Sequence, residues 1–322
     1  MILMKTIGVL TSGGDAPGMN AAVRAVVRTA VYHGITVKGI RRGYNGLMEG
    51  DIIDLDSRAV SGIIQLGGTM LYSARSPKFK TEEGVREAVE TCKKHGIEGI
   101  VVIGGDGSFR GARDLSLASI PCVGVPATID NDISSTEYTI GFDTAMNTVI
   151  QMVDRLRDTC DSHERCSVVE VMGRHAGHIA LRTAIGVGAL AVMVPEREND
   201  LNSVIEKIKE TQRMGKKHFI VVVAEGVGGV TQMAEKIEAA TGIETRGTIL
   251  GHVQRGGSPT LRDRLIATQM GYEAVQLLKS GIGNRVVAYR LGKVVDYDIY
   301  EALNMKKGLE DNLCLLADIT AI

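Results

Sequence analysis

The feature of this sequence that most constrains its fold is a repeated order of segments: an apolar run, a glycine-rich turn and a stretch with helical spacing. Residues 7–10 form the first apolar run, residues 11–18 form the turn, and Met19–Tyr32 has the spacing of a helix. Apolar runs without polar alternation, such as residues 100–103, are typical of parallel strands covered on both faces. The order therefore predicts an α/β protein with right-handed crossovers between parallel strands.

The same order continues along the chain, and the length of 322 residues suggests about two domains. Further strands are predicted at residues 35–40, 97–103, 121–125, 167–172, 189–194, 219–224, 248–250 and 285–291. Further helices are predicted at residues 85–95, 144–160, 176–185, 201–214 and 263–280. We expect two lobes with a hinge near residues 140–142, each a largely parallel sheet covered by helices in a three-layer, Rossmann-like arrangement.

The composition argues against two classes of partner. Lys and Arg number 37 and Asp and Glu number 38, so the formal charge is −1, which argues against coating nucleic acid or an anionic membrane. Aromatic residues make up 4% and Trp is absent, which disfavours a stacking platform for single-stranded nucleic acid. The sequence also has no apolar run near the roughly 20 residues of a membrane span. We therefore expect no nucleic-acid partner and no membrane partner.

Glycine and cysteine usage are both informative. The chain has 39 glycines, which in a globular protein mark turns and places where the backbone approaches a ligand. The five cysteines are odd in number and contain no CxxC spacing, so neither a disulfide framework nor a zinc site is indicated. We expect reduced, mostly buried thiols and a cytoplasmic location.

In open α/β sheets ligands bind beyond the carboxyl ends of the strands, so two glycine-rich turns are candidates for phosphate binding. Residues 11–20 carry three glycines and open a helix, where backbone N–H groups can hold an anion. Residues 104–108 repeat the arrangement, with Asp106 between glycines. A carboxylate among phosphates needs a cation, so Asp106 is the predicted Mg²⁺ ligand. The alternatives are a tight structural turn and a helix cap.

Two carboxylates come after the predicted strand 121–125. Asp130 and Asp132 are two positions apart, so an extended loop would turn both toward one side. Neighbouring carboxylates are costly unless one accepts a proton from a substrate or orients the surroundings of the other. The alternative is an Asx-rich turn with no chemical role.

The second half of the chain places basic residues next to predicted strand ends. Arginine is suited to bidentate recognition of phosphate, so several arginines near such ends favour a phosphate ligand. The candidates are Arg165, Arg174, Arg246, His252 and Arg255, with the carboxylate Glu225 directly after the strand 219–224.

Two phosphate-binding turns, a Mg²⁺ carboxylate, a carboxylate base and several arginines are the components of phosphoryl transfer. The chain lacks the P-loop sequence GxxxxGK[ST] and the HRD and DFG sequences of protein kinases. A dinucleotide-dependent oxidoreductase needs an acid at the end of the second strand, where this chain has Arg41 and Arg42. A non-catalytic sugar-phosphate-binding protein stays an alternative, because it needs the turns and arginines but not Asp106 together with Asp130.

At these residues the chain resembles the bacterial 6-phosphofructokinase family over essentially its whole length. The matching segments are the loop with Gly14 and residues 104–108, 128–132, 172–174 and 252–257. The resemblance implies ATP and fructose 6-phosphate as substrates, Mg²⁺ as cofactor and an active site in the cleft between two lobes. It implies an ATP-binding lobe of residues 1–140 plus 254–304, and a sugar-phosphate-binding lobe of residues 141–253 plus 305–322.

The resemblance also implies a role for each matched residue. The catalytic residues would be Asp130, as the base on the sugar 1-hydroxyl, with Thr128, Asp132, Arg174 and Arg75. The nucleotide would be held by Gly14, Arg75, Ser76, Gly105, Asp106, Gly107 and Ser108, with Asp106 on the metal. The sugar phosphate would be held by Thr128, Ile129, Asp130, Arg165, Met172, Gly173, Arg174, Glu225, Arg246, His252 and Arg255. Arg165 and Arg246 would reach the sugar phosphate of a neighbouring subunit, which implies a homotetramer.

The phosphoryl donor is indicated by the residue at position 107. Relatives that use pyrophosphate generally carry Asp at the position of Gly107 and Lys at that of Ala127. Gly107 leaves room for a nucleotide, so the resemblance implies ATP, and a pyrophosphate-dependent enzyme is the alternative. Ala127 replaces the usual glycine of ATP users and adds one methyl group.

The resemblance further implies an effector site for ADP or phosphoenolpyruvate between subunits. Its residues would be Arg24, Arg28, Arg157, Lys216, Lys217 and His218. Leu190 stands where many relatives carry an acid, and Met214 and Ser57 stand where they carry bases. Because charged contacts are lost, we expect weakened or altered allosteric control.

Overall fold

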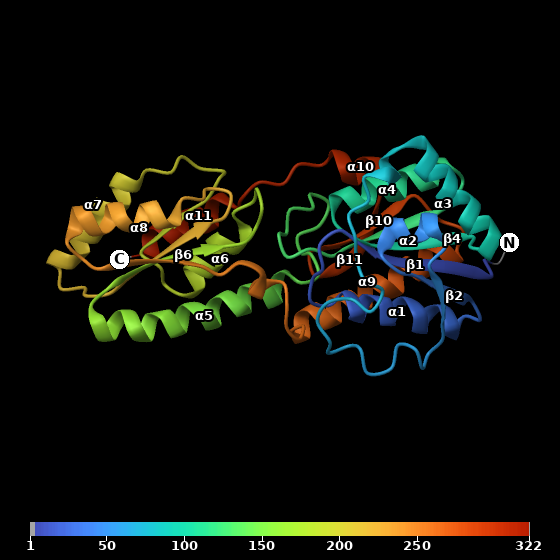
Figure 1. Cartoon of the computed structure of the whole chain (residues 1–322), viewed down its shortest axis with the longest axis horizontal. Helices are drawn as coiled ribbons and strands as arrows, with labels where there is room; N and C mark the ends of the chain where they lie inside the picture. Colours follow the sequence, from blue (N-terminus) through green and yellow to red (C-terminus); the bar gives the residue numbers. More distant parts are fainter. Residues whose placement is uncertain (1–3, 322) are drawn as a thin grey trace. The chain divides into compact units, whose positions relative to one another are not determined.

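The structure is a computed structural model that describes residues 4–321 (Figure 1). The chain divides into two compact units. Unit 1 comprises the residues up to 129, residues 133–144 and residues 255–307, and unit 2 comprises residues 130–132, residues 145–254 and the residues from 308 onward. The lobe boundaries expected from the resemblance stay a prediction.

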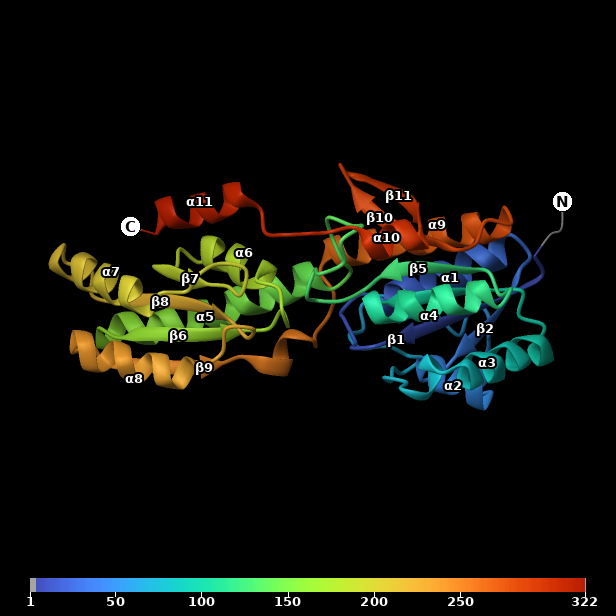
Figure 2. The ribbon, with the colours of Figure 1, turned by 90° about the horizontal axis from the view of Figure 1, so that it is seen from above.

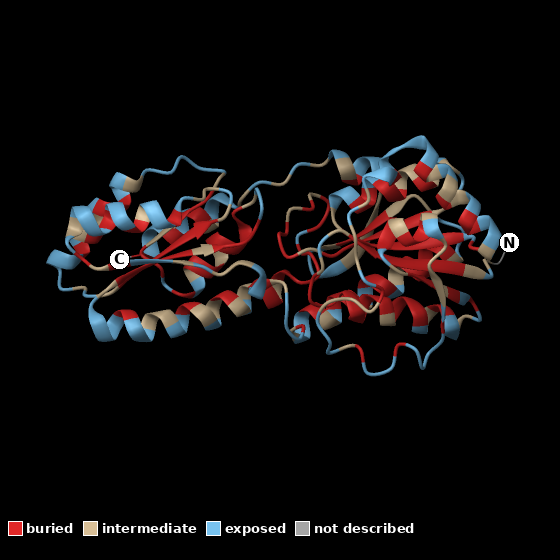
Figure 3. Ribbon diagram, in the orientation of Figure 1, coloured by how far each residue is buried: buried red, intermediate tan, exposed pale blue. Residues whose placement is uncertain are grey.

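Unit 1 contains a seven-stranded sheet with the order β11-β10-β5-β4-β1-β2-β3. The five central strands are parallel, and the edge strands β3 and β11 are antiparallel to their neighbours. The strands are β1 (Thr6–Ser12), β2 (Thr36–Ile40), β3 (Ile52–Leu55), β4 (Gly99–Gly104), β5 (Cys122–Pro126), β10 (Arg285–Arg290) and β11 (Lys293–Asp298). Every residue of β4 is buried, as the uninterrupted apolar run predicted (Figure 3).

Helices cover both faces of this sheet, so the unit has the three layers that Figure 1 shows; Figure 2 looks down on them from above. They are α1 (Met19–Tyr32) and α9 (Leu261–Lys279) on one face, and α2 (Gly43–Glu49), α3 (Glu82–His95), α4 (Asp106–Leu117) and α10 (Ile299–Asn304) on the other. α1 and α9 approach closely at Gly271, where an added Cβ would lie 2.8 Å from Cβ of Ala25. Glycine at this position therefore permits the contact.

Unit 2 contains a four-stranded, fully parallel sheet with the order β7-β8-β6-β9. Its strands are β6 (Cys166–Val171), β7 (Ala191–Met193), β8 (Phe219–Ala224) and β9 (Thr245–Ile249). Its helices are α6 (His178–Gly186), α7 (Leu201–Arg213), α8 (Val230–Thr241), α11 (Asp311–Thr320) and α5 (Phe142–His163), whose first three residues belong to unit 1. Apolar residues of α7 and α8 pack on the buried strands β6 and β8. The prediction of parallel sheets covered by helices is confirmed in both units.

Several predicted elements have the bounds expected from the sequence, including α1 and β8. α3 is followed directly by Gly96, whose φ of 64° is the left-handed conformation that glycine favours at a helix end. α2, α8, α10, α11, β3 and β11 were not predicted. The five cysteines are free and buried, as expected, and burial raises the pKa of Cys92 and of Cys166 to about 12.

None of the helices within residues 4–321 is both long enough and apolar enough to cross a bilayer.

Candidate active site

The two predicted phosphate-binding turns lie side by side in unit 1. β1 leads to β2 on one side, and the chain then returns to β4 on the other side of β1. Ser12 at the end of β1 pairs with Gly104 at the end of β4, so the turns after these strands leave the sheet together. This change of direction is where open α/β sheets bind their ligands.

The first turn is held from the side by Arg255. Gly13 and Gly18 have φ angles of 90° and 105°, which favour glycine. Nη1 of Arg255 donates to the carbonyl oxygen of Asp15 at 3.2 Å. A Cβ added to Gly14 would lie 2.6 Å from the same Nη1, so the missing side chain leaves room for the guanidinium. Arg255 therefore lies in unit 1, with the first turn.

The second turn opens α4 and is tied to the first. Oγ of Ser108, which is buried, donates to the carbonyl oxygen of Ser12 at 3.2 Å. A Cβ added to Gly104 would lie 2.5 Å from that same oxygen. By contrast, Cβ atoms added to Gly105 and Gly107 would meet no atom within 4 Å. The turn is therefore packed at its base and open at its tip, as a phosphate-binding turn requires.

Asp106 is the first residue of α4, and its half-exposed carboxylate lies 2.9 Å from Nε of Arg110. Within residues 4–321, no three or more His, Cys, Asp or Glu side chains are grouped so that they could hold a metal ion. Mg²⁺ often binds one protein carboxylate together with substrate phosphates and waters. A single accessible carboxylate between two open glycines fits that form of binding.

The second turn rests on Tyr44 of α2, a residue that the sequence patterns did not indicate. Its hydroxyl donates to the carbonyl oxygen of Ser108 at 2.5 Å, and its ring stacks on Phe79 with centroids 4.0 Å apart. Burial raises the pKa of Tyr44 well above its usual value, so the hydroxyl stays a donor. The sequence gives no signal for this contact, because Tyr44 does not follow a strand directly.

The segment that carries Arg75 and Ser76 is hydrogen-bonded to the first turn through two residues that precede Arg75, Tyr72 and Ser73. Oγ1 of Thr11 donates to the carbonyl oxygen of Tyr72 at 2.8 Å, and Oγ of Ser73 donates to that of Gly13 at 2.6 Å. Arg75 itself is exposed. The predicted nucleotide-binding residues of unit 1 are therefore carried by segments that are hydrogen-bonded to one another.

The segment after β5 continues beside the second turn. The amide of Ala127 donates to the carbonyl oxygen of Gly104 at 3.0 Å. Asp130 is only 5% exposed, and Asp132 is partly buried. The expectation of an extended loop is wrong here, because Asn131 between them has a left-handed φ of 52°. An asparagine adopts this conformation more readily than most residues, so the carboxylates belong to a turn.

In unit 2 the predicted sugar-phosphate residues come after three adjacent strands. Met172–Arg174 come after β6, Glu225 after β8 and His252 after β9, and β6 lies between the other two. The carboxylate of Glu225 accepts hydrogen bonds from the amides of Gly173, at 3.3 Å, and of Arg174. Arg174 has a left-handed φ of 59°, a conformation that costs energy and is often found at functional sites.

Two further residues shape this edge of the sheet. The side chain of Gln254 is fully buried and accepts a hydrogen bond from the amide of Met172 at 3.2 Å. Burial and the nearby Glu225 raise the pKa of Glu170. Gln254 was not predicted, although it falls within the segment 252–257 that carries the resemblance.

Arg165 and Arg246 lie at the opposite edge of the same sheet. Arg165 directly precedes β6, and Arg246 is the second residue of β9. Both pair with Glu244, at 2.8 Å for Arg165 and 2.5 Å for Arg246, and these contacts hold the pKa of Glu244 below its usual value. The six residues of β6 span about 20 Å, so within one chain these arginines do not join Met172–Arg174.

The predicted effector residues form two groups, one in each unit. Arg24 and Arg28 of α1 line a pocket of about 680 Å³ in unit 1, and burial and the neighbouring Arg28 lower the pKa of Arg24. In unit 2, Lys217 pairs with Glu164 at 2.6 Å and His218 with Asp161 at 2.9 Å. The same region holds Lys216, whose pKa is lowered by burial and by the nearby Arg157.

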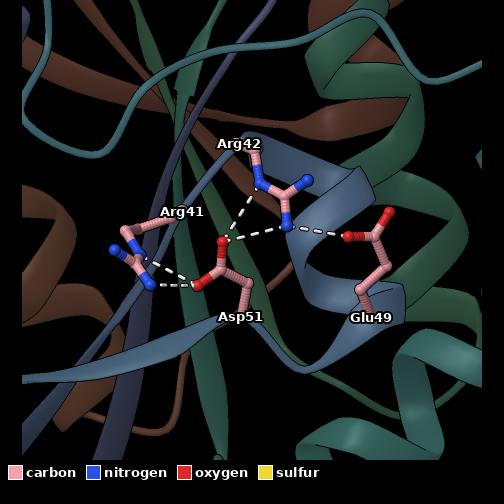
Figure 4. Close-up of polar contacts among 4 residues, drawn as sticks. All are labelled: Arg41, Arg42, Glu49 and Asp51. Atoms are coloured by element: carbon pink, nitrogen blue, oxygen red, sulfur yellow. Dashed lines mark hydrogen bonds and ion pairs between the residues drawn. The ribbon is translucent and has the colours of Figure 1, made fainter.

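The arginines at the end of β2 are engaged in ion pairs (Figure 4). Arg41 and Arg42 both contact Asp51, at 2.6 and 3.0 Å, and Arg42 also contacts Glu49 at 2.7 Å. Burial opposes the ionised form of Asp51, but the hydrogen bonds from the two arginines hold its pKa below the usual value. These residues fasten the two ends of α2, the helix that carries Tyr44.

Comparison with known proteins decides the family. The family profile described as Phosphofructokinase matches residues 6–278. The chain belongs to the phosphofructokinase family. It is 54% identical over 316 residues to the ATP-dependent 6-phosphofructokinase of Clostridium botulinum strain Hall, covering 98% of this chain and 99% of that protein. It is 55% identical over 314 residues to the protein of the same name from Bacillus cytotoxicus, covering 98% of both.

Solved phosphofructokinases have the same fold as this family member. Phosphofructokinase from Saccharomyces cerevisiae aligns with a TM-score of 0.88 and 34% identity, covering 99% of this chain and 48% of the yeast chain. A pyrophosphate-dependent phosphofructokinase from Marinobacter aquaeolei aligns with a TM-score of 0.85 at 23% identity, covering 99% of this chain and 92% of that chain. The second similarity supports the fold alone.

Proposed function

We propose that this phosphofructokinase-family protein transfers the γ-phosphoryl group of MgATP to the 1-hydroxyl of fructose 6-phosphate, giving fructose 1,6-bisphosphate and ADP. The observation that carries the proposal is a buried carboxylate, Asp130, which follows three residues after Ala127, whose amide donates to Gly104 at the base of the second glycine turn. Curated relatives more than half identical over nearly the whole chain are named ATP-dependent 6-phosphofructokinases, which supports the same reaction.

The nucleotide is assigned to unit 1. The amides of the two turns and the side chain of Arg75 bind the phosphates of the nucleotide. Gly14 and residues 105–108 are assigned the positions nearest to these phosphates, and Ser76 is assigned to the nucleotide beside Arg75. Asp106 would hold Mg²⁺, which when bound neutralises phosphate charge. Because α4 begins at Asp106, its N-terminus faces the phosphates with a partial positive charge.

The chemistry is assigned to Asp130. It orients the sugar 1-hydroxyl and accepts its proton as the phosphoryl group arrives, late in a loose transition state. Thr128 lies next to the transferred group, Arg174 and Arg75 neutralise its charge, and Asp132 orients the surroundings of Asp130.

The sugar phosphate is assigned chiefly to residues beyond the strand ends of unit 2. Glu225 holds the turn that carries Gly173 and Arg174, so it fixes the positions of the backbone groups that meet the sugar. The residues assigned to it from the same chain are Ile129, Met172, Gly173, Arg174, Glu225, His252 and Arg255, with Thr128 and Asp130 at the reacting end.

We further propose a homotetramer in which Arg165 and Arg246 bind the 6-phosphate of a neighbouring subunit's sugar. Their position about 20 Å along the sheet from Met172–Arg174 supports this, because they cannot serve the same sugar within one chain. The tetramer, and a cytoplasmic location, are part of the proposal.

The substitution Arg246→Ala is expected to raise KM for fructose 6-phosphate about tenfold or more and to leave KM for ATP within about twofold, because a charged phosphate contact is lost. Initial-rate kinetics measure both constants. Arg197→Ala, which removes another exposed, ion-paired arginine of unit 2, is the control. An unchanged KM for the sugar would contradict the assignment.

Allosteric control by ADP or phosphoenolpyruvate is proposed to be weak. Leu190 is 1% exposed and packs in the core of unit 2, so it offers no carboxylate for a metal of an effector. We expect phosphoenolpyruvate to shift the half-saturating concentration of fructose 6-phosphate by less than about threefold. A titration that shows strong sigmoidal inhibition would overturn this expectation.

The reaction itself is tested by measuring ADP formation with MgATP in the presence and absence of fructose 6-phosphate. We expect turnover that depends on the sugar phosphate. The competing function, a non-catalytic sugar-phosphate-binding protein, predicts sugar binding in calorimetry with no ADP formed. Tagatose 6-phosphate differs from fructose 6-phosphate in the configuration of one hydroxyl group. Using it in the same assay tests whether the protein also phosphorylates this sugar.

A further inference from the structure

Two carboxylates are buried in the described part of the chain, Asp130 and Asp263. Asp130 has a place in the proposed reaction. Asp263, the third residue of α9, is 0% exposed and so far has none. Burying a carboxylate is costly unless several donors compensate for the lost water, so its retention points to the groups that it contacts.

Four donors from a single distant segment converge on Asp263. Its Oδ1 accepts from the hydroxyl of Tyr138 at 3.1 Å and from the amide of Gly141 at 2.8 Å. Its Oδ2 accepts from the amide of Thr144 at 2.9 Å and from the hydroxyl of the same residue at 2.5 Å. Asp263 therefore holds residues 138–144, at the start of α5, to the start of α9.

Residues 138–144 in turn hold the segment that leads to Asp130. The amide of Ile140 donates to the carbonyl oxygen of Pro126 at 3.0 Å, and Ala127 and Ile140 form a parallel β-bridge. Oγ1 of Thr139 donates to the carbonyl oxygen of Thr128 at 2.6 Å. Two consecutive sets of hydrogen bonds thus connect Asp263 with Thr128.

We infer that Asp263 is a positioning residue, which through residues 138–144 fixes the segment 126–130 that carries Thr128 and Asp130. The inference rests on the proposed function for its effect on rate. A carboxylate suits the position because all four contacts are donors and an ionised carboxylate only accepts. Burial raises the pKa of Asp263, while the hydrogen bonds from Thr144 and Gly141 oppose that rise.

A purely structural alternative exists. The amide of Thr144, which donates to Oδ2, lies in the first turn of α5, where N–H groups have no carbonyl partner within the helix ladder, so Asp263 would act as a helix cap and no more. The two roles predict different effects of losing the carboxylate. Loss of a cap affects thermal stability alone, whereas loss of a positioning residue affects order in residues 126–130 and the rate of the chemical step.

The test is Asp263→Asn, with Asp54→Asn as a matched control because Asp54 is an exposed, ion-paired aspartate of the same unit. The amide of Asn would present donors to Thr144. We expect kcat to fall about 30-fold, with KM for ATP within about threefold, because a small misplacement of reacting groups is costly. Hydrogen exchange followed by mass spectrometry should be faster in peptides covering residues 127–130 and 138–144. The control should match the parent protein in both measurements.

Tyr138→Phe removes one of the four donors and keeps the ring, and it gives a milder version if Asp263→Asn fails to fold. We expect it to lower kcat about threefold and to speed exchange in residues 138–144. Unchanged kcat and exchange in a folded variant would overturn the inference. The hydrogen-exchange measurement needs no substrate and therefore tests the inference separately from the proposed function. A parent protein without kinase activity would contradict the proposed function, and the exchange rates would then decide the inference.

Discussion

Replacing the buried carboxylate by an amide in Asp130→Asn is expected to lower kcat about 1,000-fold, equivalent to about 4 kcal/mol of transition-state stabilisation. The amide has nearly the shape of the carboxylate but cannot accept the proton of the sugar hydroxyl. KM for both substrates should change less than kcat, because the phosphate contacts come from other residues. Single-turnover kinetics with MgATP and fructose 6-phosphate measure the chemical step directly.

Two comparisons make that expectation decisive. Asp54→Asn, an exposed aspartate that pairs with Lys38, should keep the parent kcat. A melting temperature of Asp130→Asn close to that of the parent protein would separate lost chemistry from lost folding. A folded Asp130→Asn variant that retains more than about a tenth of the parent kcat would mean that another group accepts the proton.

The second large effect is expected for Gly107→Asp. A Cβ at position 107 would meet no protein atom within 4 Å, so the side chain extends into the space assigned to the nucleotide. A carboxylate about 4 Å from a phosphate is repelled by several kcal/mol at an intermediate dielectric constant. We expect kcat/KM for ATP to fall at least about 100-fold, while the melting temperature stays close to that of the parent protein, because Asp is favourable in the first turn of a helix.

Gly308→Asp is the matched control, because a Cβ at Gly308 also meets no atom within 4 Å and the residue lies outside the assigned sites. It should leave kcat/KM for ATP unchanged. If Gly107→Asp used ATP as well as the parent protein does, position 107 would not select the donor, and the assignment of the nucleotide to this turn would fail.

Local patterns predicted the strands and turns well where one physical signal dominated. The apolar run of β4 predicted a buried strand, because a strand without polar residues must be covered on both faces of the sheet. The two glycine turns lie side by side as expected, because parallel strands end at one edge of a sheet; phosphate binding there stays a prediction. α2 and β11 were not predicted from the sequence. α2 is only seven residues long, and β11 is an antiparallel edge strand with only partly buried side chains, so neither has a long apolar pattern.

Contacts between residues far apart in the chain could not be predicted in this way. Tyr44 supports the second turn, and Asp263 holds residues 138–144, yet nothing in the neighbouring sequence of either residue marks the contact. The extended loop expected at residues 130–132 is a turn, with Asn131 in the left-handed conformation. The two-residue spacing of the carboxylates carries no information on the backbone angles of the residue between them.

The most direct test of the central claim compares two phosphoryl donors in one assay. Formation of fructose 1,6-bisphosphate is measured from fructose 6-phosphate and Mg²⁺ with equal concentrations of ATP or of pyrophosphate. We expect product with ATP and none above background with pyrophosphate. Faster turnover with pyrophosphate would contradict the assigned donor, and no product with either donor would contradict the proposed reaction.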